Sequence, residues 1–366
     1  MSRRVALVTE VIAPYRIPVF NELAALLDGG LHVFFIAETE GRRDWPVLRD
    51  EIRFRYDVLG GLDFTVPYRG DRQPVYLAPP LLPRLVRGKF DTVLLGGWNH
   101  LEAYWSLAYC LLRRARLALW SETPLLGSTP PRRPLRSALK RLVIRAADAY
   151  AVPGPSAGRY LEAFAASPER IHHAPNAVDN DFWSTRPDEA TVDDMDRPVL
   201  LYVGRLVESK GVVDALAAFA ASELAGRASF LIAGDGPERG ALEARAPAGV
   251  SFLGACNRNR LRALYHSADL LVVPSRYDPW GLVVNEAACA GLPALGSGSA
   301  GAARDLIRDG ENGLLFPGGD VGALRRAFDR IAREPGLLDS LRPGAAAIAA
   351  RSTPEACAAG LRAAIG

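Results

Sequence analysis

Residues 274–291, PSRYDPWGLVVNEAACAG, join a strand-like run to a helix-like run and carry two acids, Asp278 and Glu286. The residues before them, 268–274 (ADLLVVP), predict a short buried parallel strand, and residues 282–290 predict the first turns of a helix. In open α/β sheets, ligands bind in loops that follow the carboxyl ends of strands. Two carboxylates in such a loop can hold hydroxyl groups of a ligand. Alternatively, Asp278 caps the helix and Glu286 lies on a solvated face.

A second segment, residues 198–213 (PVLLYVGRLVESKGVV), is an apolar strand that ends at Gly204 and is followed by Arg205 and Lys210. Arginine can bind phosphate oxygens through two parallel hydrogen bonds, and lysine acts as a compact point charge, so the pair can neutralise a diphosphate. Lys210 is one of 3 lysines in a chain with 41 arginines, which makes lysine an unusual choice at this position. The alternative is that both side chains are solvated surface charges.

A third segment, residues 230–239 (FLIAGDGPER), predicts another short strand that runs into a tight turn at Gly234. Glycine permits positive φ and close approach of a ligand, although a tight strand-to-helix turn explains the pattern equally well. The next predicted strand, residues 250–254, leads to Cys256. Strand-to-helix loops therefore recur along this half of the chain.

These segments, in this order and spacing, resemble retaining glycosyltransferases of family 4. Members of that family have the GT-B architecture, an α/β fold of two Rossmann-like parallel-sheet domains facing across a cleft. They usually carry Glu, seven residues, then Glu where this chain has Asp278 and Glu286, so the first carboxylate here is one methylene shorter. The Gly-Leu-Val run that follows Trp280 and the Gly-Arg, four residues, Lys-Gly arrangement match the family as they stand.

The resemblance implies a role for each motif residue. The expected catalytic residues are Arg205, Lys210, Asp278 and His100. The expected donor-binding residues are Gly204, Arg205, Lys210, Gly234, Cys256, Asp278, Trp280, Gly281, Leu282, Val283 and Glu286. Within this set, the arginine and lysine would grip the donor phosphates, the first acid and the amides after it would contact the transferred sugar, and the second acid would bind the ribose.

The acceptor side is expected in the N-terminal half, where the motifs are less explicit. Many family members have a Gly-Gly loop after the first strand, but residues 11–18 here read VIAPYRIP. Either Arg16 and the backbone amide of Ile17 replace that loop, or the loop shapes the acceptor site. His100 and Glu122 each follow a predicted strand at its carboxyl end and are further acceptor-side candidates. The alternative for both is an ordinary hydrogen-bonded structural role.

Strand-like runs alternate with helix-like runs throughout, a pattern typical of parallel sheets with crossover helices. We expect an N-terminal domain at 1–183, a linker at 184–197, a nucleotide-sugar-binding domain at 198–350, and a helix at 351–366 that crosses back to the first domain. Residues 40–76 are expected to be irregular and to belong to the acceptor side.

Composition excludes several classes of protein. A net charge of +3 in 366 residues, without a nucleic-acid motif, gives no reason to expect a nucleic-acid partner. Four cysteines and five histidines lie scattered without ligand spacing, so we expect reduced thiols, no metal site and no cofactor. The first apolar run is too short for a signal peptide, and a cytoplasmic location is expected. The basic amphipathic segment 132–147 can dock on an anionic membrane, although its apolar stripe also fits the core face of a surface helix.

The expected function is transfer of a sugar from a nucleoside diphosphate donor to an acceptor hydroxyl, with retention of the anomeric configuration. The acceptor can be a carbohydrate, a lipid-linked molecule or a small molecule. One alternative is a nucleotide-sugar epimerase or a phosphorylase of the same fold. Another is a non-catalytic sugar-nucleotide binding subunit, suggested by Asp278 and by the absence of a Gly-Gly loop.

Overall fold

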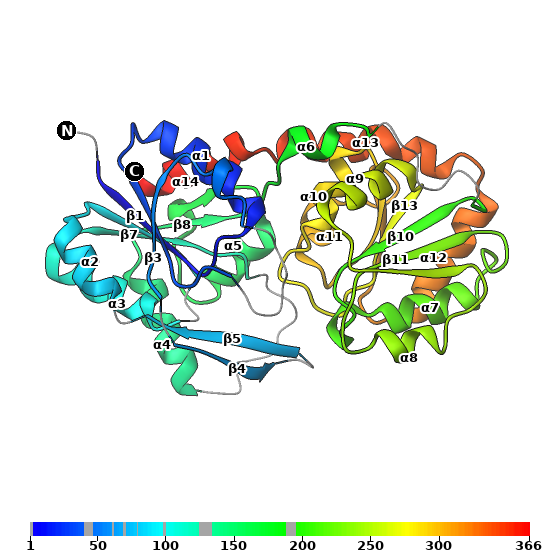
Figure 1. Cartoon of the computed structure of the whole chain (residues 1–366), viewed down its shortest axis with the longest axis horizontal. Coiled ribbons are helices and arrows are strands. Elements are labelled where there is room, and N and C mark those ends of the chain that lie inside the picture. Colours follow the sequence, from blue (N-terminus) through cyan, green and yellow to red (C-terminus); the bar gives the residue numbers. More distant parts are fainter. Residues whose placement is uncertain are drawn as a thin grey trace. The chain divides into compact units, whose positions relative to one another are not determined.

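The computed structural model describes residues 3–39, 47–60, 62–68, 71–78, 80–97, 100–123, 134–187 and 195–366, and Figure 1 labels its elements. Contacts between residues divide the chain into two compact units. The first contains most of the chain up to Val178 together with Thr353–Gly366, and the second contains Asp179–Ser352. Part of the expected linker 184–197 and the first two residues of the expected helix 132–147 lie outside the described residues.

The first unit is built on a parallel seven-stranded sheet with the order β3-β2-β1-β6-β7-β8-β9. Its strands are β1 Val5–Thr9, β2 Leu31–Phe35, β3 Arg55–Val58, β6 Thr92–Gly96, β7 Arg116–Trp120, β8 Ala149–Val152 and β9 Ile171–His173. Its helices are η1 Pro14–Arg16, α1 Ile17–Leu26, η2 Arg49–Glu51, α2 Leu81–Gly88, α3 Glu102–Arg113, α4 Pro134–Ala146, α5 Pro155–Glu162, η3 Pro168–Arg170 and α14 Pro354–Ile365.

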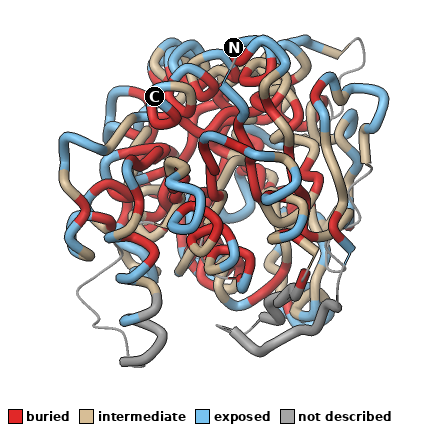
Figure 2. The backbone as a smooth tube through the Cα atoms, turned by 90° about the vertical axis from the view of Figure 1, so that its left-hand side faces the viewer, coloured by how far each residue is buried: buried red, intermediate tan, exposed pale blue. Residues whose placement is uncertain are grey.

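Successive residues of a strand point to opposite faces of the sheet, so both faces of β1 are apolar because both are covered. Val5 and Leu7 face a core shared with α1 and α14. Ala6 and Val8 face a second core shared with α2, α3, α4 and α5. Figure 2 colours the backbone by residue burial and shows buried residues inside this unit and exposed turns on its surface.

The expectation that residues 40–76 are irregular is wrong for the part of this range that the structure describes. It contains β3, η2 and a separate two-stranded sheet of β4 Leu62–Tyr68 and β5 Asp71–Leu77. In β3, polar Arg55 and Asp57 alternate with Tyr56 and Val58 along the outermost strand of the sheet. The run is short and only half apolar, so its pairing with β2 decides that it is a strand.

The last helix, α14, packs on α1 within the first unit. Both N- and C-terminal segments take part, because Arg3 Nη1 donates a hydrogen bond to the carbonyl oxygen of Ile365 at 3.0 Å. Gly360 allows close packing: a Cβ atom there would lie 2.1 Å from the carbonyl oxygen of His173. This helix therefore forms part of the core beneath the first sheet.

The second unit is built on a six-stranded parallel sheet with the order β12-β11-β10-β13-β14-β15. Its strands are β10 Val199–Val203, β11 Ser229–Ala233, β12 Val250–Gly254, β13 Leu270–Val273, β14 Ala294–Ser297 and β15 Gly313–Phe316. Its helices are α6 Asn180–Ser184, η4 Glu208–Lys210, α7 Val212–Ala220, α8 Arg239–Glu243, α9 Arg258–Ser267, α10 Val283–Cys289, α11 Gly301–Leu306, α12 Val321–Arg333 and α13 Leu337–Arg351.

The short helix α6 belongs to the second unit, although the sequence had placed it at the end of the first domain. Asp179 caps α6 by accepting a hydrogen bond from the Phe182 amide at 3.1 Å, and the same carboxylate pairs with Arg258 of α9. The helix also packs against α10. These contacts put the boundary after Val178 rather than after residue 183.

Each sheet has one point where the strand order reverses, between β1 and β6 in the first unit and between β10 and β13 in the second. Ligands of doubly wound sheets bind outside the carboxyl ends of the strands at such points. The loops after β1 and β6, and after β10 and β13, are therefore the places to examine for a site. Among the described residues, no helix is long and apolar enough to cross a bilayer.

Candidate functional site

The loops after β10 and β13 are joined to each other by main-chain hydrogen bonds. The amides of Arg276 and Tyr277 both donate to the carbonyl oxygen of Ser209, at 2.9 and 3.0 Å. Gly211 adopts φ +66°, and a Cβ atom at this position would lie 2.3 Å from the carbonyl oxygen of Pro274. The Lys-Gly pair of the second motif thus allows its loop to lie directly against the loop of the two acids.

This contact brings Lys210 and Asp278 together although they are 68 residues apart. Lys210 Nζ lies 2.5 Å from Asp278 Oδ2, and the aspartate is 8% exposed. The other carboxylate oxygen accepts a hydrogen bond from the Trp280 amide at 3.3 Å. The helix-cap interpretation of Asp278 is wrong, because α10 begins after Leu282 and has no side-chain cap. The aspartate instead fixes its own turn and holds the lysine.

The residues after Asp278 form the turn that leads into α10. Trp280 is buried, and its Nε1 donates to Asn285 Oδ1 at 2.9 Å, so its ring supports the turn from within. Gly281 has φ +96°, a conformation that glycine adopts without strain. Leu282 and Val283 start the helix, whose first amides have no partner within the helix itself. The expected sugar-contacting amides therefore sit at a helix start.

Glu286 lies in the first turn of α10. Its Oε2 accepts a hydrogen bond from the hydroxyl of Tyr265, a buried residue of α9, at 2.7 Å. Burial of the carboxyl group raises the pKa of Glu286 to about 7, against the opposing effects of the Tyr265 hydrogen bond and the positive charge of Arg258. The glutamate is thus held by one oxygen and is close to its titration point at neutral pH.

Arg205, Gly204 and Gly234 lie where β10 and β11 end side by side. The Gly204 amide donates to Ala233 O at 3.0 Å, and a Cβ atom on Gly234 would lie 1.8 Å from Gly204 O. Tyr202, itself buried, donates its hydroxyl proton to Arg205 O at 2.7 Å and so fixes the backbone of the arginine. Glycine at position 234 is therefore required for the two loops to touch.

Cys256 follows β12 in the next loop along the same edge. The Gly234 amide donates to Gly254 O at 2.8 Å, which ties the loop after β11 to the end of β12. The Cys256 thiol lies 3.6 Å from the same carbonyl oxygen, and burial raises its pKa. All expected donor-binding residues thus lie at or directly after the carboxyl ends of four strands of the second sheet.

The structure also reveals supporting residues that sequence reasoning missed. Arg276 donates two hydrogen bonds to Asp214 of α7, each of 2.7 Å, and so anchors the loop of Asp278. Arg276 was detectable, because it stands two residues before Asp278 in the quoted segment. Tyr265 carries no local signal, since only the packing of α9 against α10 brings it to Glu286.

In the first unit, Arg16 and Glu122 form an ion pair across 106 residues of sequence. The guanidinium of Arg16 also lies over the Trp120 ring, 3.8 Å from its centroid. Burial alone would lower the pKa of Arg16, but Glu122, Tyr15 and Cys357 together outweigh this effect, so the pKa is raised. The Ile17 amide donates to Pro14 O. Both groups expected to replace the Gly-Gly loop therefore already have protein partners.

His100 lies at the other loop of the first reversal point and pairs with a residue that the sequence did not suggest. Its Nε2 lies 2.9 Å from Oε1 of Glu10, which directly follows β1. His100 is 8% exposed, and both side chains line a small hollow that also includes Glu102. The candidates His100, Arg16 and Glu122 thus all sit at the carboxyl edge of the first sheet, in two separate pairs. Within the described ranges, no group of three histidine, cysteine or acidic side chains is arranged to hold a metal ion.

Comparisons with known proteins follow the same division of the chain. Residues 185–347 match the model of the family described as glycosyl transferases group 1. Glycogen synthase of Mycobacterium tuberculosis is 37% identical over 142 residues, covering 37% of this chain and 34% of that protein. The 2-deoxystreptamine glucosyltransferase of Streptomyces kanamyceticus is 31% identical over 226 residues, covering 58% of each.

Solved structures match over nearly the whole chain. HepE of Anabaena, crystallised with UDP-glucose, superposes with a TM-score of 0.72 at 16% identity and covers 98% of both chains. The chain has the GT-B fold, an α/β fold with two Rossmann-like parallel sheets, as the sequence predicted. The alignments with the curated relatives are shorter, spanning about a third of the glycogen synthase and 58% of the glucosyltransferase.

Proposed function

We propose that this chain is a retaining glycosyltransferase that moves a sugar from a nucleoside diphosphate donor to an acceptor hydroxyl. The observation that carries this proposal is the contact between Lys210 and Asp278, which joins the phosphate motif and the acidic motif at the reversal point of the second sheet. The match of residues 185–347 to glycosyl transferases group 1 supports it independently, because this range includes every expected donor-binding residue.

In the proposed reaction, the bond between the sugar C1 and the β-phosphate oxygen breaks while a bond from C1 to the acceptor oxygen forms on the same face. Arg205 and Lys210 stabilise the negative charge that develops on the departing diphosphate. A phosphate oxygen of that leaving group takes the acceptor proton, so the step needs no dedicated protein base, metal or cofactor. Asp278 positions Lys210 before the donor binds and faces the sugar when the lysine turns to the phosphates.

The acceptor side is proposed to lie at the carboxyl edge of the first sheet. Arg16 and Glu122 hold one another there, and His100 and Glu10 form a second pair. Paired acids and cations offer both donors and acceptors to a polyhydroxylated acceptor. Arg16 is engaged by Trp120 and Glu122, which favours the alternative in which the loop 11–18 shapes the acceptor site.

A cytoplasmic location that includes the inner surface of the membrane is part of the proposal. The α4 helix contributes the exposed side chains of Arg141 and Arg145, but Leu142 is its one large apolar side chain exposed among those described. Charge alone gives reversible binding to anionic lipid, and stable binding needs apolar side chains as well.

The first test is a thermal-shift screen of the purified chain with UDP, GDP, ADP and TDP sugars. A true donor at about 100 times its Kd should raise the free energy of unfolding by ~2.7 kcal/mol, and unrelated nucleotides should not. The stabilising donor is then incubated with the protein, and release of free nucleoside diphosphate is followed by chromatography. Slow hydrolysis with release of the α-anomer from an α-linked donor supports a retaining transferase.

The other outcomes of the same experiment identify the alternatives. Stabilisation by a donor without any hydrolysis or transfer points to a non-catalytic binding subunit. Conversion of the donor into an epimeric sugar points to an epimerase. In a separate incubation with a glycoside and inorganic phosphate, formation of a sugar 1-phosphate points to a phosphorylase. Absence of stabilisation by all nucleotide sugars contradicts the proposed function.

A further inference from the structure

The α3 helix has an unusual distribution of side chains. Its two polar residues ahead of the last turn, Glu102 and Ser106, are buried at 1% and 0% exposure. By contrast, Trp105, Leu111 and Leu112 are exposed at 40%, 70% and 75%. A surface helix normally places its apolar side chains toward the core and its polar side chains toward water. The outer face of α3 is therefore apolar, and this pattern indicates a face that a partner covers.

The exposed apolar residues form a continuous stripe along α3. Leu101, Trp105, Ala108 and Leu112 follow one another at spacings of four, three and four residues, which places them on one side of a helix. Leu111 lies beside the end of this stripe. The stripe extends for about three turns, so it is not a single apolar side chain of the kind that normal surfaces carry.

Neighbouring helices on the same side of the sheet continue this surface. The α3 helix packs between α2 and α4, and all three contribute to the same core. Val86 of α2 is 46% exposed and Leu142 of α4 is 53% exposed. Of the seven large apolar side chains exposed among the described residues, six lie on α2, α4 and the Leu101 to Leu112 stretch. We call the exposed side of α2, α3 and α4 the α2–α4 face.

The three helices that form the α2–α4 face are also basic in sequence. The three helices contain seven Lys and Arg residues and one acid, the buried Glu102, which gives a charge of 7 − 1 = +6. The whole chain carries +3, so the rest of the chain carries 3 − 6 = −3. Each helix places an arginine next to an exposed apolar residue in the sequence: Arg87 after Val86, Arg113 after Leu112, and Arg141 before Leu142.

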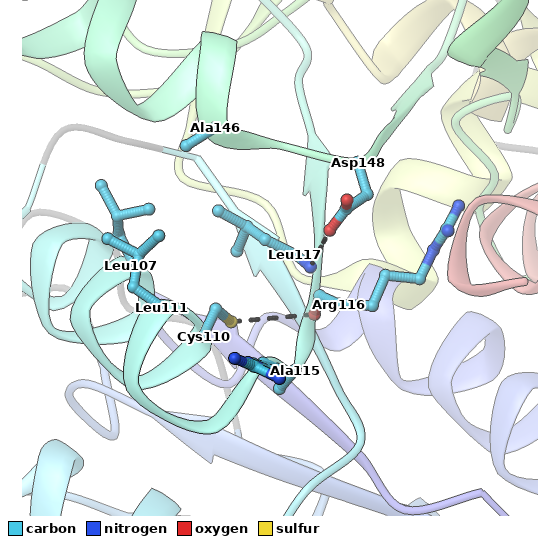
Figure 3. A pocket seen from close by; sticks show the side chains of 9 residues that line it. Leu107, Cys110, Leu111, Ala115, Arg116, Leu117, Ala146 and Asp148 are labelled. Atoms are coloured by element: carbon cyan, nitrogen blue, oxygen red, sulfur yellow. Dashed lines mark hydrogen bonds between the residues drawn. The ribbon is translucent and has the colours of Figure 1, made fainter.

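One end of the stripe opens into a hollow of about 370 Å³ between the end of α3 and the end of α4 (Figure 3). Leu107, Leu111 and Leu117 line it on the apolar side. Asp148, an acidic residue of this lining, accepts a hydrogen bond from the Leu117 amide at 2.8 Å. Arg116 points away from the hollow and donates a hydrogen bond to Ala364 O at 3.3 Å. The hollow thus adjoins Leu111, and its lining is mixed, with Arg114 and Asp148 beside the leucines.

We propose that the α2–α4 face docks the chain on an anionic lipid bilayer, with Trp105, Leu111 and Leu112 inserted among the lipids and the neighbouring arginines on their headgroups. The apolar side chains project from three adjacent helices and are accompanied by arginines, which suits a fluid, negatively charged surface. Tryptophan is enriched at the boundary between headgroups and acyl chains. The inference extends the proposed membrane-surface location, but it does not depend on any step of sugar transfer.

The test is co-sedimentation of the full chain with phosphatidylcholine vesicles, with and without phosphatidylglycerol, in the absence of substrates. We expect binding to the vesicles with phosphatidylglycerol, at least about tenfold weaker binding to phosphatidylcholine alone, and weakening by added salt. The double substitution Leu111→Glu with Leu112→Glu should reduce binding at least about tenfold, because it places charge where apolar contact is required. Both side chains are exposed, so the variant should fold, which circular dichroism verifies.

Two controls make the test specific to the α2–α4 face. Leu26→Glu alters another exposed leucine, at 49%, on α1, which covers the opposite face of the sheet, and it should leave vesicle binding unchanged. Arg141→Gln with Arg145→Gln should weaken binding to the phosphatidylglycerol vesicles only, and Arg227→Gln in the second unit should have no effect.

The proposal is overturned if the chain does not bind the anionic vesicles, or if Leu26→Glu reduces binding as much as the double substitution. It is also overturned if sedimentation equilibrium shows a dimer that the double substitution disperses, without vesicle binding, because a second copy would then cover this face. None of these results affects the glycosyltransferase proposal, because that proposal is tested by donor stabilisation and hydrolysis in the absence of lipid.

Discussion

The two parallel sheets reverse their strand order at equivalent points, but the loops that meet there are built from different residues. In the second unit, Gly211 and Gly234 allow neighbouring loops to touch through their backbones. In the first unit, the corresponding loop has no glycine, and Arg16 fills the space by stacking on Trp120. The same topology thus presents backbone and cations in one unit, and a packed set of ion pairs in the other.

This difference shows that strand order determines where a site lies, whereas the loop residues determine what it can bind. Close backbone approach with Arg205 and Lys210 suits a diphosphate, which needs many donors and positive charge. The pairs of Arg16 with Glu122 and of His100 with Glu10 offer both hydrogen-bond donors and acceptors, which suits a hydroxylated molecule. Substitutions in the second unit should therefore affect the donor, and those in the first unit should affect the acceptor.

The largest effect is expected for the phosphate-binding cations. Arg205→Ala and Lys210→Ala should each lower kcat by roughly 10² or more, the scale for losing one preorganised electrostatic partner. Arg227→Ala, on an exposed turn of the same unit, is the matched control. Steady-state kinetics with the donor found in the screen measures the effect. Turnover near the wild-type value in both variants would contradict the proposed role of Arg205 and Lys210 in binding the diphosphate.

A smaller effect is expected for Asp278→Asn, which should lower kcat about 10- to 100-fold. The reason is that displacement of a catalytic group by about 1 Å can lower the rate about 10²-fold. The substitution removes the negative charge that holds Lys210 but preserves the turn at Trp280. Asp278→Glu adds a methylene to a side chain that already lies close to Gly281, because a Cβ atom built on this glycine would be only 3.3 Å from Asp278 Oδ2. We therefore expect loss of activity or a changed donor.

Calorimetry with the free nucleoside diphosphate sharpens the Asp278 prediction. The Asp278→Asn variant should bind the free nucleoside diphosphate with almost unchanged affinity, because in the proposed complex the sugar, and not the diphosphate, contacts this carboxylate. Full activity of this variant with every donor would show that the Lys210 contact is only structural.

Glu286→Gln is expected to weaken nucleotide binding by ~1 to 3 kcal/mol, the cost of compromising a charged hydrogen bond. The carboxyl pKa of about 7 adds a pH dependence. Below this pH the group is protonated and is a poorer acceptor, so nucleotide affinity of the wild-type chain should rise as the pH increases from 6 to 8. In Glu286→Gln, the pH dependence of nucleotide affinity that comes from this carboxyl group should disappear. Any pH dependence that comes from the nucleotide itself should remain.

Isothermal titration at several pH values measures this difference, with Tyr265→Phe as a graded control that keeps the carboxylate but removes its hydrogen bond. Equal pH profiles for wild type and Glu286→Gln would contradict a ribose-binding role for Glu286.

The smallest effect is expected in the first unit. Arg16→Lys keeps the charge but loses the planar group that stacks on Trp120, so acceptor KM should rise about five- to tenfold while donor affinity stays constant. Donor hydrolysis without acceptor provides the control, because it involves only the donor side. A change in donor affinity as large as that for Glu286→Gln would show that the loop 11–18 contacts the donor, the other alternative for this loop.

Local pattern was sufficient to place β10, β11, β12 and β13 of the second sheet and the segments that carry the expected donor-binding residues. Buried strands such as β10 and β13 are continuous apolar runs, and glycine marks the turns that follow them. The edge strand β3 was missed because half of its residues are polar, and β4 and β5 were missed with it. The pairing of such segments depends on a neighbouring strand that is distant in the sequence.

The sequence by itself determined two parallel α/β sheets and the motif segments that follow their strands. Tertiary structure alone decided which side chains meet: Lys210 with Asp278, Tyr265 with Glu286, and His100 with Glu10 across 90 residues. It also decided that Glu102 and Ser106 of α3 are buried while Leu111 and Leu112 are exposed. The reason is that periodicity encodes the faces of single elements, whereas the order of strands in a sheet determines which loops and helices become neighbours.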